Sequence, residues 1–170
     1  SMGKGLFILN PATNQQRPFH ENPVFRDASI LSISGKDDTL YVSSLEGSMS
    51  IGISPENTDI SKTYRFFNYD NTSTGTNYIY NIFKDSRGRT WFATDGNGLT
   101  LLQQGSFSYF TKKDNLKDDH IYSITEDKQG HIWFSTASAG IYRYDGKKFT
   151  NYGVAEGLRD LNISVFKTYT

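Results

Sequence analysis

The 170-residue chain carries 18 Lys and Arg against 18 Asp and Glu, so a formal net charge of zero argues against nucleic acid or an anionic membrane surface as a partner. It has no cysteine, which excludes disulfides and thiolate metal sites, and no stretch approaches the roughly 18 apolar residues that insertion across a bilayer needs. Aromatic residues make up 15% of the chain, with 15 Gly and only 4 Pro. This composition favours short strands and tight turns, so we predict an all-β protein.

The N-terminal part already shows a periodicity. Residues 1–2 have the form of a remnant left by a cleaved expression tag. In residues 3–22, Gly5 lies 42 positions before Gly47 and opens a short apolar stretch, which we interpret as the two outer strands of an incomplete unit. Residues 27–69 then form a complete unit.

The repeat is clearest in the centre of the chain. Two further complete units are predicted at residues 77–112 and 119–153, within which residues 79–94 and 121–136 align without a gap. Residues 160–170 begin a further copy. The shared positions, each pair 42 residues apart, are Asp85 and Asp127, Gly88 and Gly130, Trp91 and Trp133, and Gly98 and Gly140. So many identities at one separation indicate a true internal repeat.

Each unit is predicted to hold four short strands. In the last complete unit they are expected at about residues 120–126, 131–136, 140–144 and 148–152. An Asp-x-x-Gly turn joins the first two strands, because Asp can bond its own backbone and Gly supplies a positive φ. Four strands in about 42 residues are typical of a β-propeller blade. We therefore predict four-stranded antiparallel blades, about three complete and two partial, forming a single segment of a larger propeller.

The last complete unit resembles a known repeat family. The pattern consists of Ile121, Ile124, Asp127, Gly130, Ile132, Trp133, Phe134, Thr136, Gly140, Ile141 and Tyr144, followed by Phe149, Tyr152 and Glu156-Gly157-Leu158. It is similar to the two-component regulator propeller repeat, and the resemblance extends from about residue 29 to 168. The family usually has an aliphatic residue after the Trp, where this chain has Phe92 and Phe134.

The resemblance implies a function. Repeats of that family form the periplasmic sensory part of hybrid two-component histidine kinases, and the sensed ligand is often an oligosaccharide. The expected role is therefore ligand sensing in the periplasm, with an oligosaccharide as the partner and no catalysis by this segment. The kinase itself would lie elsewhere in the parent protein.

Recurring positions are expected to pack between blades. Trp91 and Trp133 stand at one position of the second strand, where every blade must fill the same gap. The same argument applies, less strictly, to Tyr80 and Tyr122. Sugar stacking on these rings is the alternative.

Ligand-binding residues are expected where the repeats differ, on loops at one face. Planar polar groups for sugar hydroxyls are offered by Asp95, Asn97, Arg159 and Asp160, and stacking partners by Tyr78 and His120. For any one of these six residues, a solvated loop position is the favoured interpretation, and ligand binding is the alternative. The acid pairs at 37–38 and 118–119 are interpreted as solvated.

No catalytic, cofactor or metal site is predicted. The three His residues, His20, His120 and His131, show no metal-ligand spacing. Asp95-Gly-Asn-Gly98 lacks the remaining ligands of a calcium loop. The sequence also has no nucleophile elbow, phosphate-binding loop or dinucleotide fingerprint.

Two other functions stay open. The blades could serve as a protein–protein or dimerisation scaffold of a receptor, or, less favoured, as a propeller lyase or glycosidase. A closed propeller needs at least about four blades, and open sheet edges promote association. We therefore expect self-association, or contact with further blades of the parent chain.

Overall fold

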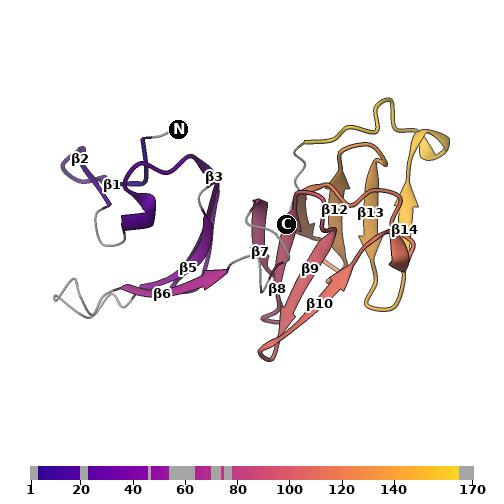
Figure 1. The fold of residues 1–170 in the computed structure, drawn as a ribbon, viewed down its shortest axis with the longest axis horizontal. Helices are drawn as coiled ribbons and strands as arrows, with labels where there is room; N and C mark the ends of the chain where they lie inside the picture. The colour runs from indigo at the N-terminus through magenta and orange to yellow at the C-terminus, as the bar shows by residue number, and fades with distance from the viewer. Residues whose placement is uncertain are drawn as a thin grey trace.

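The computed structural model describes residues 4–19, 23–45, 47–53, 64–69, 74 and 78–164, which form a succession of antiparallel sheets (Figure 1). Three sheets have four strands each, and every strand in them pairs with its neighbour in the chain. A two-stranded sheet precedes them. The predicted fold of four-stranded antiparallel blades is confirmed. No helix in this described part is long and apolar enough to cross a bilayer.

The strands follow the repeat. The two-stranded sheet consists of β1 (Phe7–Asn10) and β2 (Gln15–Pro18). The first blade consists of β3 (Ile30–Lys36), β4 (Thr39–Ser44), β5 (Gly47–Ile53) and β6 (Tyr64–Tyr69). The second consists of β7 (Ile79–Lys84), β8 (Thr90–Thr94), β9 (Leu99–Gln103) and β10 (Ser106–Phe110). The third consists of β11 (Ile121–Glu126), β12 (Ile132–Thr136), β13 (Ile141–Tyr144) and β14 (Phe149–Tyr152). Short 3-10 helices are η1 (Pro23–Phe25), η2 (Lys112–Asp114) and η3 (Val154–Glu156).

Parts of the predicted end units lie outside the described residues. These are residues 1–3, which include the predicted tag remnant, residues 20–22, and residues 165–170. The predicted strand in 160–170 is therefore described only as far as Ser164, without regular strand geometry.

The hydrophobic core lies between successive blades. Trp91 and Leu99 of the second blade share one buried cluster with Ile121 and Phe134 of the third. A second cluster joins Tyr41 of the first blade to β7 and β8 of the second. Each blade is thus stabilised mainly by burying its faces against its neighbours, as expected for stacked repeats.

The first strand of each blade brings the blades together at one side. β3 contacts β7, and β7 contacts β11, while the later strands of each sheet lie progressively further out (Figure 1). Each of these inner strands has a register shift at its second residue. Such a bulge redirects the side chain that it carries.

Candidate functional site

Two loops from neighbouring blades meet at one end of the inner strands. One is the turn after β8, residues 95–97, and the other is the connection that leads into β11. The Gly98 N–H donates to the Asp119 carbonyl (2.8 Å), which ties the loops together. The Ala137 N–H donates to the His120 carbonyl (3.0 Å), which ties the connection to the third blade. The backbone therefore places side chains from both blades at one boundary.

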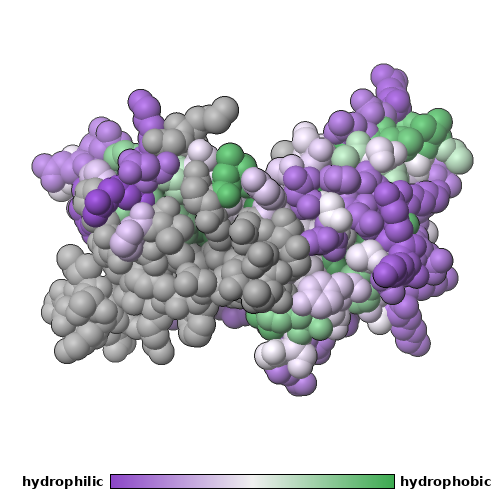
Figure 2. All heavy atoms as spheres, in the orientation of Figure 1, coloured by the Kyte–Doolittle hydropathy of each residue, from purple (hydrophilic) through white to green (hydrophobic). Residues whose placement is uncertain are grey.

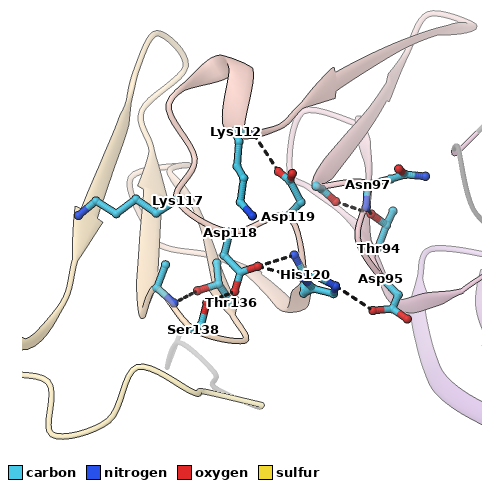
Figure 3. A network of polar contacts seen from close by, with 12 residues as sticks. Thr94, Asp95, Asn97, Lys112, Lys117, Asp118, Asp119, His120, Thr136 and Ser138 are labelled. Carbon is cyan, nitrogen blue, oxygen red and sulfur yellow. Dashed lines mark hydrogen bonds and ion pairs between the residues drawn. The ribbon is translucent and has the colours of Figure 1, made fainter.

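His120 stands at the centre of this boundary (Figure 3). Its Nδ1 lies 3.0 Å from Asp118 Oδ1, and its Nε2 lies 3.8 Å from Asp95 Oδ1. The other oxygen of Asp118 accepts a hydrogen bond from Ser138 Oγ (2.7 Å). Asp118 is only 3% exposed, whereas the His120 side chain is 49% exposed. A buried carboxylate thus orients an imidazole that remains open to solvent.

The protonation state of Asp118 follows from its surroundings. Burial alone would raise the pKa of this carboxyl, but hydrogen bonds from Ser138 and from the His120 N–H and side chain outweigh it and lower the pKa to about 2. Because an ionised carboxylate can only accept, Nδ1 of His120 carries a proton. The other nitrogen, Nε2, faces the Asp95 carboxylate, so an imidazole and a carboxylate stand side by side at the boundary. Together they can bond a ligand that offers neighbouring hydroxyl groups.

Of the acid pair at 118–119, which the sequence analysis interpreted as solvated, Asp118 is buried. Asp118 is buried by its bonds to His120 and Ser138, and Asp119 Oδ1 accepts from the Lys112 N–H (2.8 Å). Both carboxylates accept from backbone donors of the connection, but Asp119 stays partly exposed. The hint was the recurrence of Asp at positions 118 and 160.

Of the six predicted ligand residues, Asp95 and His120 are brought together. Tyr78 precedes β7 at the repeat position of His120, and is 50% exposed. Its carbonyl accepts from the Asp95 N–H (3.0 Å). The Asn97 N–H donates to Thr94 Oγ1 (3.2 Å), so its backbone closes the turn after β8.

Arg159 and Asp160 belong to the next repeat position along the chain. Asp160 Oδ1 accepts from the Asn162 N–H (2.9 Å), just as Asp118 Oδ1 accepts from the His120 N–H (3.0 Å). Arg159 is exposed. Within the described residues, neither Arg159 nor Asp160 bonds to Asp95 or His120. The site is therefore built by two of the predicted residues, with Asp118 and Ser138 added.

The repeated Asp and Trp form a separate, structural unit in the second and third blades. Asp127 Oδ2 accepts from Trp133 Nε1 (2.7 Å), and its Oδ1 accepts from the Gln129 and His131 N–H groups. Asp85 accepts from Trp91 Nε1 (2.8 Å) in the same way. One carboxylate thus closes the hairpin turn and anchors the indole. Trp91 is fully buried, and Trp133 partly so.

Sequence reasoning missed a cleft of about 550 Å³ beside the inner strands. Tyr80 and Tyr122 line it and contact each other edge to face, with ring centroids 5.0 Å apart. Both are only partly buried. The recurrence of Tyr at this position predicted packing between blades. In the structure, the bulge in each inner strand turns the two rings toward the cleft. A bulge leaves no clear mark in a single sequence.

Each four-stranded sheet begins with an inner strand and continues outward as an antiparallel meander, with a hydrophobic core between successive sheets. This arrangement defines a β-propeller segment. The family model of the two component regulator propeller matches residues 74–96 and 115–138, which include the boundary site. Both matched stretches fall on the repeats whose motif resembles this family. No curated protein matches the chain.

Solved structures share this fold. The extracellular domain of a hybrid two component system from B. thetaiotaomicron, BT4673, is 15% identical over 89% of this chain, with a TM-score of 0.67. A second such domain, BT3049, is 20% identical over 92% of this chain, with a TM-score of 0.55. Virginiamycin B lyase from Staphylococcus aureus is 23% identical over 74% of this chain, with a TM-score of 0.55. This chain spans 22%, 27% and 41% of the three structures, in that order.

Proposed function

We propose that this chain is a ligand-recognising segment of the sensor region of a hybrid two-component system, and that its ligand is an oligosaccharide. The observation that carries the proposal is His120, held by buried Asp118 and presented beside Asp95 at a boundary between two blades. The boundary falls inside the matched two-component regulator repeats. An imidazole and a carboxylate side by side at a solvent-open loop can bind hydroxyl groups.

The proposed signal is a change in how blades pack. Asp95 belongs to the turn of the second blade, while His120 leads into the first strand of the third. A ligand that bridges the two side chains favours one arrangement of the blades over another. Such differential binding is the only way in which a ligand shifts a conformational equilibrium.

The compartment belongs to the same proposal. Both two-component relatives in fold are extracellular domains, which supports a periplasmic location for this chain. The segment contributes binding, and the kinase chemistry is placed elsewhere in the parent protein.

Calorimetric titration with an oligosaccharide panel tests the boundary site. We expect saturable binding that Asp95→Ala and His120→Ala each weaken by about tenfold, because each removes one of the two polar side chains. Lys128→Ala, on an exposed hairpin turn, is the matched control and is expected to bind normally. Unchanged affinity in both site variants would place the ligand elsewhere.

A catalytic role is the alternative that the lyase fold raises. An oriented imidazole can act as a general base, so turnover must be measured directly. The two-component repeats and the sensor domains of the same fold favour a non-catalytic segment. Recovery of the oligosaccharide unchanged after long incubation supports binding alone.

A scaffold role is supported by one further observation. Ile33 is 53% exposed, whereas Ile82 and Ile124, at the same position of the next two inner strands, are 1% and 5% exposed. The buried two pack against the preceding blade. Ile33 therefore has the character of a surface that a further blade covers, and the mass of the chain in solution tests this.

A further inference from the structure

The inner strands carry a second candidate binding feature, separate from the boundary loops. Their bulges stand at the same repeat position, occupied by Leu31, Tyr80 and Tyr122. All three side chains line the cleft of about 550 Å³. This volume lies within the roughly 300–1,000 Å³ usual for small-molecule sites.

The chemistry of the cleft is polar but uncharged. Besides the bulge residues, its walls are formed by Ser32, Asn81, Ser123, Asn162 and Ser164. No Lys, Arg, Asp, Glu or His is among these described lining residues. A charged ligand would therefore find no counter-charge, while a neutral ligand with hydroxyl groups meets amides and hydroxyls.

The two tyrosines add an apolar surface with polar ends. Their ring planes stand at 84°, so they present surfaces in two directions. Burial raises the pKa of Tyr80, and the Asp95 carboxylate and Tyr122 raise it further. Its hydroxyl thus stays protonated at neutral pH, and the Asp95 carboxylate is its hydrogen-bond partner. A sugar ring, with apolar C–H faces and hydroxyl edges, matches this mixture.

Two observations separate the cleft from ordinary packing. The bulge position is occupied by Leu31, Tyr80 and Tyr122, and Ser164 stands at the same repeat position, so the lining of the cleft differs between repeats. Variation between repeats is the mark of a functional surface. Asn81 donates to Ser32 Oγ (3.0 Å), but its Oδ1 is buried without a hydrogen-bond partner. An unsatisfied acceptor at the wall favours a ligand or solvent donor there.

We infer that the cleft lined by Tyr80, Tyr122 and Asn81 is a subsite for a neutral saccharide ring. The inference rests on the proposed oligosaccharide-sensing function and assigns a place and a ligand class to it. Because Tyr80 also interacts with Asp95, the subsite adjoins the boundary site and extends it along the inner strands.

Titration with neutral trisaccharides (cellotriose, maltotriose, mannotriose) and with digalacturonic acid tests this subsite. We expect a neutral sugar to bind and its Kd to rise about tenfold or more in Tyr80→Ala and in Tyr122→Ala, as for an aromatic contact at the centre of an interface. Tyr109→Ala, on outer strand β10, is the matched control, since Tyr109 is 44% exposed and lies outside the cleft.

The outcomes separate the inference from the function on which it rests. Sugar binding that neither tyrosine variant changes would overturn the subsite and leave the function standing. Binding of the acidic sugar alone would overturn the ligand class. No binding of any sugar would contradict both. Should a variant fail to fold, tyrosine-labelled NMR of the unchanged chain decides, because the ring signals of Tyr80 and Tyr122 must shift on titration and that of Tyr109 must not.

Discussion

A single carboxylate organises each hairpin of the complete Trp-bearing blades. Asp127 accepts from Trp133, His131 and Gln129, so Asp127→Ala leaves several donors without their partner. We expect a loss of about 1–3 kcal/mol in the free energy of unfolding. Chemical denaturation followed by tryptophan fluorescence measures it. Lys128→Ala in the same turn is the control, and an equal effect of both variants would refute the role of the carboxylate.

Two hydrogen-bonded carboxylates also predict how the stability of the fold depends on pH. Hydrogen bonds outweigh burial and hold the pKa of Asp118 and of Asp127 at about 2, against 3.8 for an unperturbed carboxyl. Both pKa values are lowered in the folded state, so their contribution is complete above about pH 4 and is lost as pH falls from about 4 to about 2. Thermal melts at a series of pH values should show this loss of stability in the same pH range. The loss should be smaller in Asp127→Ala, because that variant lacks one of the two carboxylates. A flat profile would contradict it.

At the scale of elements, the turn between second and third strands must touch the end of the fourth. Gly140 has φ +77°, and a Cβ there would overlap the Tyr152 carbonyl. Gly146 has φ +96° but faces open space. Gly140→Ala should therefore lower the free energy of unfolding more than Gly146→Ala does. The second variant loses only the ~1–2 kcal/mol that a left-handed backbone costs a residue with a Cβ. Comparison of the two melting temperatures checks this, and equal shifts would exclude the close approach as the cause.

The sequence predicts the strands and turns, because these depend on local rules. It does not predict the candidate sites, because these form where two blades meet. The 42-residue spacing and the Asp-x-x-Gly turns place the strands of the third blade within about one residue of their observed ends. Asp95 and His120 were recognised as polar loop residues, but their approach depends on two blades packing. The burial of Asp118 and the bulge at Tyr80 depend on tertiary contacts in the same way.

At the scale of the whole molecule, the exposed inner face of the first blade predicts association. On the face that Figure 2 shows, the surface over the C-terminal sheets is mainly hydrophilic. Leu31 and Ile33 of β3 are 38% and 53% exposed. We expect the chain to dimerise at micromolar concentration and Ile33→Asp to be a monomer, by light scattering across a dilution series. Identical masses for both proteins would contradict this surface.

The central claim is that the chain binds an oligosaccharide and does not transform it. The most direct measurement is calorimetric titration of the unchanged chain with the oligosaccharide panel, followed by chromatography of the same sugar after overnight incubation. The account predicts saturable heat and a sugar recovered at its original length. Shortened or unsaturated products would identify an enzyme, and the absence of binding across the panel would contradict the sensor in favour of a scaffold.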